Sequence, residues 1–321
     1  MIRVHEVSKH YNKTKAVDNI SFEVKEGETL VLLGTSGCGK TTTLRMINRL
    51  AEPTGGSIYV DGKNITDQSP ETLRRGIGYV LQHHGLFPHY TVAENISVVP
   101  QLMKWDKEKT EHRTTELLDK LQLPAATYAS MYPDQLSGGQ QQRVGLARAL
   151  AAEPPVLLMD EPFGALDTVT RTSIRRDFKE LDELKRKTIV MVTHDVQEAF
   201  ELGDRICLMD KGHIVQIGTA AELLFSPAND FVRLFLQQQR FQLELQALTI
   251  EDVFELLVPV ELKVRTEKDL PLRCSIWDAL EIISTDKNAS ESIYIARKNN
   301  QQKQVDTPSL MSAFTQYKSR Y

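Results

Sequence analysis

The sequence predicts an α/β fold built on a mixed, mostly parallel sheet, and three observations support this class. Continuous apolar runs of strand length occur at 29–34, 155–162 and 187–195, as in strands buried on both faces. Segments with helical spacing separate these runs, which is typical of parallel strands joined by helices. Apolar and polar residues alternate over 5–28, so an antiparallel β subdomain is expected before the first buried strand.

Helical spacing and turn residues predict the remaining elements of the first 250 residues. A helix is expected over 41–50, where Leu44, Ile47 and Leu50 share one face. An Asp-Gly turn inside 56–65 predicts a hairpin. Beyond these we expect a mainly helical stretch at about 85–150, a helix over 170–187, a closing hairpin over 204–218 and a pair of helices over 221–246.

The pattern of the chain changes after about residue 247. Over 275–318 the apolar spacing predicts a helix, two strands and a second helix, which together make a small α+β module. The predicted organisation is a first domain at 1–235, with a helical subdomain at about 85–150, then a helical linker at 236–269 and a C-terminal module at 270–321.

Composition limits the classes of protein to consider. The 321 residues are 41% hydrophobic and 26% charged, as in an ordinary globular protein, and the net charge of −4 does not favour nucleic acid as a partner. Cys38, Cys207 and Cys274 lie far apart in the sequence and suggest a reducing, cytosolic setting. No apolar run reaches the roughly 18 residues of a membrane span, so any membrane work is expected to need other subunits.

The stretch "GTSGCGKT" carries the strongest chemical signal. It fits G-x-x-x-x-G-K-[ST] between a buried strand and a helix, the context in which backbone N–H groups cradle phosphates. In this arrangement Lys40 reaches the β- and γ-phosphates, and the Thr41 hydroxyl holds Mg²⁺. The residues expected around the phosphates are Gly34, Thr35, Ser36, Gly37, Cys38, Gly39, Lys40, Thr41 and Thr42.

A pair of carboxylates ends the next buried strand, "VLLMDE". The carboxyl ends of parallel strands meet at one edge of a sheet, so Asp160 and Glu161 are expected beside the phosphate loop. The first carboxylate suits the Mg²⁺ shell, and the second suits the water that attacks the γ-phosphate.

The stretch "QLSGGQQQR" predicts a second helix N-terminus with free N–H groups, which favours an anion. Taken alone, the same residues could do no more than cap a helix. Because the first loop already surrounds one nucleotide, this second phosphate site needs another explanation.

These motifs resemble those of the ATP-binding cassette ATPases of ABC transporters, over residues 1 to about 235. The resemblance implies a P-loop NTPase cassette with a mixed-sheet core, an antiparallel β subdomain and a helical subdomain. It also assigns Tyr11 to adenine stacking, Gln82 to the Mg²⁺ and attacking water, Gly164 to Asp167 to the D-loop, and His194 to the γ-phosphate. Many relatives have serine where this chain has Gly164, a mild departure.

The resemblance implies how the site is completed. ATP and Mg²⁺ are the expected cofactors, with Thr41, Gln82 and Asp160 toward the metal and Lys40, Gln82, Glu161 and His194 as the catalytic set. The signature residues Ser137, Gly138, Gly139 and Gln140 are expected to contact the ATP of a second copy. We therefore expect a head-to-tail homodimer.

The region after Gln82 resembles most closely the ATPases of importers for quaternary amines such as glycine betaine, carnitine or choline. The resemblance implies integral membrane permease subunits, a separate extracytoplasmic substrate-binding protein and a position on the cytoplasmic side of the membrane. Leu86, Phe87 and Pro88 would line a groove for the permease, or would be core residues. An importer for an amino acid or a sugar, and less favourably a soluble ABC ATPase of DNA repair or ribosomes, remain alternatives.

Residues from about 270 to 321 resemble a single CBS repeat, where the subfamily has a pair. A lone repeat would pair with its copy in the dimer, or would be a relic without a ligand. A regulatory protein with a dead ATPase is disfavoured, because Lys40, Asp160, Glu161 and His194 are intact.

Overall fold

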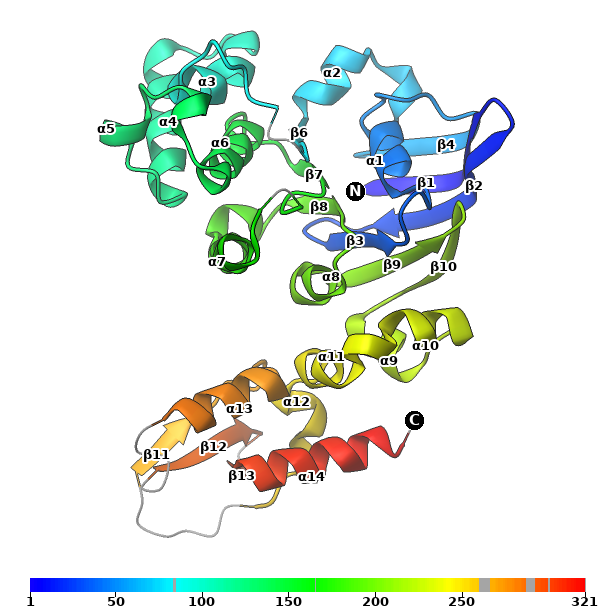
Figure 1. Cartoon of the computed structure of the whole chain (residues 1–321), viewed down its shortest axis with the longest axis vertical. Coiled ribbons are helices and arrows are strands. Elements are labelled where there is room, and N and C mark those ends of the chain that lie inside the picture. The colour runs from blue at the N-terminus through cyan, green and yellow to red at the C-terminus, as the bar shows by residue number, and fades with distance from the viewer. Residues whose placement is uncertain (83–84, 165, 260–265, 287–291, 300, 321) are drawn as a thin grey trace. The chain divides into compact units, whose positions relative to one another are not determined.

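The computed structural model describes residues 1–82, 85–164, 166–259, 266–286, 292–299 and 301–320. The chain forms two compact units, Met1–Ile217 and Gly218–Tyr321 (Figure 1). We had expected the first domain to reach residue 235. Residues 218–235 instead belong to the second unit, because the two helices that they form pack with the helix that follows them.

Two sheets organise the first unit. A four-stranded sheet has the order β2-β1-β4-β5, with antiparallel pairing, and a six-stranded sheet has the order β10-β9-β3-β8-β7-β6. Neighbouring strands from β9 to β6 pair in parallel, as the continuous apolar runs predict. The strands are β1 (Ile2–Tyr11), β2 (Thr14–Val24), β3 (Thr29–Gly34), β4 (Gly55–Val60), β5 (Lys63–Asn64), β6 (Ile77–Val80), β7 (Val156–Asp160), β8 (Thr188–Val192), β9 (Arg205–Asp210) and β10 (His213–Gly218).

Helices connect these strands. Those of the first unit are α1 (Lys40–Ile47), α2 (Pro70–Arg75), α3 (Val92–Leu102), α4 (Lys107–Lys120), α5 (Ala125–Tyr128), α6 (Gly138–Leu150), α7 (Thr168–Glu180) and α8 (Val196–Leu202). Short 3₁₀ turns follow at Ile65–Asp67, Pro133–Gln135 and Asp182–Leu184. Helices α3 to α6 pack on one another and form the expected helical subdomain.

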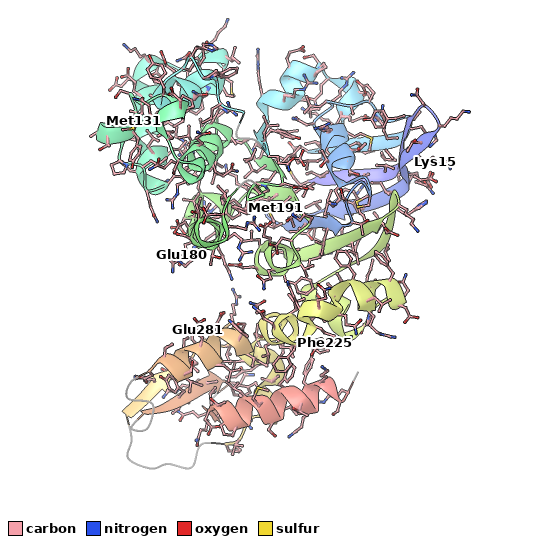
Figure 2. All side chains as sticks on the ribbon, viewed as in Figure 1. Lys15, Met131, Glu180, Met191, Phe225 and Glu281 are labelled. Atoms are coloured by element: carbon pink, nitrogen blue, oxygen red, sulfur yellow. The ribbon has the colours of Figure 1, made fainter. Side chains whose placement is uncertain are left out.

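The main core lies where α1 meets both sheets. Alternate residues of β3 (Leu30, Leu32) join Leu44 and Met46 of α1 and the inward face of the antiparallel sheet in one buried cluster. Because the parallel strands are apolar on both faces, the sheet also accepts helix α8 against β3. Figure 2 shows Met191 of β8 inside this unit, whereas Lys15 lies at the tip of the β1–β2 hairpin. The core thus fixes the start of α1, which carries the phosphate loop.

The second unit begins with a run of short helices and continues as a small α+β module. Its elements are α9 (Ala220–Phe225), α10 (Asp230–Leu236), α11 (Arg240–Ala247), α12 (Ile250–Val253), β11 (Thr266–Asp269), α13 (Ile276–Thr285), β12 (Ser292–Lys298), β13 (Gln301–Val305) and α14 (Thr307–Lys318), with 3₁₀ turns at Gln237–Gln239 and Phe254–Leu256. Strand β12 pairs in parallel with β11 and antiparallel with β13. The expected helix, two strands and helix are present, and β11 was not expected.

Three predicted elements differ from the structure at their ends. Helix α1 stops at Ile47 because Asn48 and Arg49 turn the backbone, so Leu50 is 50% exposed instead of sharing the buried face. The helix expected over 170–187 ends at Glu180, before a 3₁₀ turn. The pair expected over 221–246 is three helices, because the Asn229 side chain caps a new helix within that stretch.

Candidate functional site

The phosphate loop places Lys40 at the first position of α1. Its ammonium donates to the carbonyl oxygens of Gly34 (2.9 Å) and Thr35 (2.8 Å), and the side chain is 5% exposed. Thr35, Ser36 and Gly37 lie exposed on the loop, while Cys38 is buried beneath it and Thr42 lies in the first turn of the helix. A cation is thus held inside a loop whose outer surface is open, as phosphate binding requires.

Two glycines of the loop are required by close backbone contacts. Gly34 has φ of 150°, and a Cβ there would lie 2.1 Å from the Met209 carbonyl oxygen. Gly39 has φ of 107°, and its Cβ would lie 2.5 Å from the Ala16 carbonyl oxygen. The motif requires glycine at both positions, because a Cβ there would clash with the neighbouring backbone.

Thr41 and Asp160 meet at the edge of the sheet. The Thr41 hydroxyl donates to Asp160 Oδ1 at 2.8 Å, across 119 residues of sequence. Asp160 is 4% exposed, and burial raises the pKa of its carboxyl above the ordinary value, with the Thr41 hydrogen bond acting in the opposite direction. A hydroxyl and a carboxylate are hard oxygen donors of the kind that Mg²⁺ prefers, so the donor set fits that ion.

A second cluster centres on one oxygen of Glu161. Gln82 Nε2 donates to Glu161 Oε2 at 3.0 Å, and His194 Nδ1 lies 3.2 Å from the same oxygen. Glu161 has φ of 45°, the left-handed region that non-glycine residues adopt rarely, and its N–H donates to the Val192 carbonyl. The strained turn after β7 therefore points this carboxylate at Gln82 and His194, which come from the ends of β6 and β8.

The residues on either side of His194 hold its loop in place, and the motifs of the sequence analysis did not include them. The Thr193 hydroxyl donates to Glu198 Oε2 at 2.5 Å, and both side chains are about 2% exposed. Asp195 Oδ1 accepts from the N–H groups of Gln197 and Glu198 and caps α8. Asp195 followed three residues later by Glu198 is a helix-start signal that could have found this turn.

Tyr11 lies at the end of β1 and is 48% exposed. The Lys9 ammonium lies 4.9 Å from the centre of its ring. The role of this ring in stacking on adenine stays a prediction.

The signature residues form the start of α6. The Ser137 hydroxyl accepts the Gln140 N–H (3.3 Å) and Gln140 Oε1 accepts the Ser137 N–H (2.8 Å), which makes a capping box. Gly138 is exposed, and a Cβ on Gly139 would lie 2.8 Å from Thr170 Cγ2 of α7. Ser137 therefore does cap helix α6. The N–H groups of Gly138 and Gly139 also lie in the first turn of this thirteen-residue helix, where the helix dipole favours an anion.

The segment after Gln82 is exposed and aromatic within its described part, from Gly85 onward. Phe87 is 40% exposed, and its ring contacts those of His89 (centroids 6.1 Å apart) and Tyr90 (5.4 Å). Asn95, fully buried on α3, accepts the Phe87 N–H and donates to the Phe87, Tyr90 and Thr91 carbonyls. Phe87 is therefore a surface residue rather than a core residue. Over the described residues, every helix is too short or too polar to cross a bilayer.

Comparisons with known proteins agree on one family. The family model described as ABC transporter matches residues 17–164. The glycine betaine/carnitine/choline transport ATP-binding protein OpuCA of Bacillus subtilis is 54% identical over 241 residues, 75% of this chain and 63% of its own. The glycine betaine uptake system ATP-binding protein YehX of Escherichia coli is 49% identical over 248 residues, 77% of this chain and 80% of its own.

A solved structure shows the same fold. The dimeric ATP-binding cassette MJ0796, in a post-hydrolysis state with ADP and Pi, has a TM-score of 0.61 and 36% identity, and the match covers 68% of this chain and 98% of that one. The sequence-based fold class is confirmed by this likeness. The chain spans 63% of the length of each of the first two curated relatives that it matches.

Proposed function

Because this chain belongs to the ABC transporter family of ATP-binding proteins, we propose that it is the ATP-hydrolysing subunit of an importer for a quaternary amine osmoprotectant. The observation that carries the hydrolytic part is the Glu161 carboxylate, which Gln82 and His194 contact through one oxygen. Motifs from four separate stretches of sequence thereby come together at one edge of the sheet.

Binding and reaction are divided between two groups of side chains. The loop N–H groups and Lys40 bind the phosphates, and Thr41 with Asp160 would hold Mg²⁺. When bound, the ion supplies Lewis-acid neutralisation of charge on the phosphate oxygens. Glu161 accepts a proton from the attacking water, Gln82 orients that water, and His194 donates a hydrogen bond to the γ-phosphate.

The signature helix completes the site of a second copy. Ser137 and the Gly138–Gly139 N–H groups face the γ-phosphate that the partner's loop holds, so ATP lies between two chains. Moving a dimer from 1% to 99% closed needs about 5.5 kcal/mol of differential binding. Two charge-assisted hydrogen bonds at each of the two sites, at about 1.5–3 kcal/mol apiece, supply it. Hydrolysis removes those contacts, and the dimer reopens.

A closed-dimer assay tests this function. Glu161→Gln retains ATP binding, so gel filtration with MgATP is expected to show a dimer that the wild type does not accumulate. The matched control is Glu180→Gln, an exposed carboxylate at the end of α7, which should behave as wild type. Monomer alone for Glu161→Gln with MgATP would contradict the assignment.

The exposed segment Gly85–Tyr90 supports a permease as partner. Asn95 holds its backbone, and Phe87 and Tyr90 present apolar rings at the surface, as an interface to another subunit needs. The protein would then work at the cytoplasmic side of the membrane, peripherally bound. Nothing in the described residues identifies an extracytoplasmic binding protein, which would meet the permease instead of this chain.

The solute class rests on the relatives. OpuCA and YehX are named for glycine betaine, and OpuCA also for carnitine and choline. Uptake of labelled glycine betaine, carnitine and choline tests the class in cells that carry the chain with its permease, with Lys40→Met as control. Uptake of an amino acid or a sugar, with no quaternary amine, would favour the alternative importers.

The second unit supports a regulatory proposal. Its β11–α13–β12–β13–α14 order gives one α+β repeat, which we propose pairs with the same repeat of the second copy, as a single CBS repeat would. Removal of 266–321, the whole repeat, tests this: loss of salt- or nucleotide-dependent control with intact ATPase is expected, and control that persists would contradict it.

A further inference from the structure

Helix α6 reaches from the signature residues to the exposed segment Gly85–Tyr90. Its first turn contains Gly138 and Gly139, and Arg148 lies ten residues later. At about 1.5 Å per residue, the two points are about 15 Å apart along the helix. One helix therefore touches both the proposed nucleotide contact and the proposed permease surface.

The helix is fixed at both ends by contacts that leave no room for side chains. At its start, a Cβ on Gly139 would lie 2.8 Å from Thr170 Cγ2. At its end, a Cβ on Gly78 of β6 would lie 2.5 Å from the Ala149 carbonyl oxygen. Val144 and Ala147 between them are fully buried. A helix packed in this way moves as one body, since close-packed interiors transmit displacement.

Arg148 joins the far end of α6 to the segment. Arg148 Nη1 donates to the Gly85 carbonyl oxygen at 2.7 Å, and Arg148 Cζ lies 5.8 Å from the centre of the Phe87 ring. Arg148 is half-buried, and this partial burial lowers the pKa of its guanidinium. A guanidinium is planar, presents its donors in a fixed fork and stacks on aromatic faces, whereas a lysine ammonium is a compact charge on a flexible stem.

The segment is stiff enough to respond as a unit. Asn95 makes four hydrogen bonds to the backbone of Phe87, Tyr90 and Thr91. A displacement of Gly85 or of the Phe87 ring is therefore expected to move the whole hydrogen-bonded segment.

We propose that Arg148 is a positioning residue that ties the segment Gly85–Tyr90 to helix α6, so that closure of the signature end on ATP is passed to the permease-facing surface. The inference rests on the proposed function, because it needs the start of α6 to contact a partner's ATP. The tie works in both directions, so a permease on the segment also biases the signature end.

Hydrogen exchange of the full chain tests the tie without a permease. In the Glu161→Gln background, MgATP is expected to slow exchange of the amides at 138–140 and to change exchange at 85–91 by about three- to tenfold, the range that one net hydrogen bond gives. Arg148→Met should abolish the change at 85–91 and leave the change at 138–140. Arg148→Lys should give an intermediate change.

Controls separate the possible outcomes. Arg75→Met, an exposed arginine in the last turn of α2, should keep both responses. An unaltered response at 85–91 in Arg148→Met, or no response there with arginine present, overturns the tie. If Arg148→Met lowers the unfolding temperature, Arg148→Lys decides, and a full response in that variant overturns the tie. No ATP response at 138–140 with arginine present overturns the proposed function itself.

Discussion

At the carboxyl ends of β6, β7 and β8 the side chains of the candidate site contact one another, whereas at the start of α6 Ser137 and Gln140 contact each other. Glu161 joins Gln82 and His194, and Thr41 joins Asp160. In the described residues, Ser137 and Gln140 bond to each other, and Gln140 also bonds to the Tyr128 hydroxyl of the helical subdomain. On the proposed function, one chain would assemble the hydrolytic half of the site and would present the signature half to a second copy.

The largest expected effect tests the assembled half. Glu161→Gln removes the proton acceptor while keeping the shape, so turnover should fall by about 10²–10⁴-fold with little change in ATP affinity. Steady-state ATPase and nucleotide binding measure the two quantities, with Glu180→Gln as control. Near-normal turnover would mean that another group takes the proton.

The outward half should behave differently. Ser137→Ala should leave ATP affinity of the isolated chain unchanged and weaken ATP-dependent dimerisation by about 10²-fold, since a charge-assisted contact is lost at two sites. The lost cap also costs about 1 kcal/mol of unfolding free energy. Thr219→Ala removes the same capping geometry from α9, so it should cost stability without weakening the dimer. If both variants weaken ATP-dependent dimerisation equally, Ser137 acts only as a helix cap and makes no contact with the partner's ATP.

Lys40→Met should weaken ATP binding by the isolated chain about 10- to 100-fold, because a charge-assisted contact of about 1.5–3 kcal/mol is lost. Lys63→Met, at the exposed start of β5, is the matched control. Fluorescent-nucleotide titration measures the affinity. Unchanged ATP affinity would show that Lys40 does not contribute to phosphate binding.

Sequence patterns predicted the residues of the hydrolytic half, but they did not predict the buried residues that hold the neighbouring loops in place. The loop at Gly34–Thr41 and the carboxylates after β7 follow from motif and strand order, because parallel strands end at one edge. Neither Glu198 nor Asn95 carries a motif, since each acts through hydrogen bonds set by tertiary position. The end of α1 was missed at Leu50 because apolar spacing continues past a turn that Asn48 and Arg49 impose.

The smallest expected effect concerns Glu198, behind His194. Burial raises the pKa of its carboxyl, so the folded state holds the proton more tightly than the unfolded state. Its contribution is fully present below the ordinary pKa of about 4.3 and is lost as pH rises through the folded pKa. Glu198→Gln should therefore gain unfolding free energy relative to wild type as pH rises from 4 to 8. Denaturant unfolding at several pH values measures it, and a constant difference would contradict the cause.

A mixing experiment tests the two-chain site most directly. Lys40→Met lacks the ammonium that binds the phosphates. Ser137→Arg blocks the start of α6, which would contact the ATP of the second copy. Each variant alone should therefore have little ATPase activity. A head-to-tail dimer of one Lys40→Met chain and one Ser137→Arg chain has one intact site. That site combines the phosphate loop of the Ser137→Arg chain with the start of α6 of the Lys40→Met chain. Random pairing then predicts recovery of about a quarter of wild-type activity. A mixture no more active than the sum of its parts would contradict the shared site.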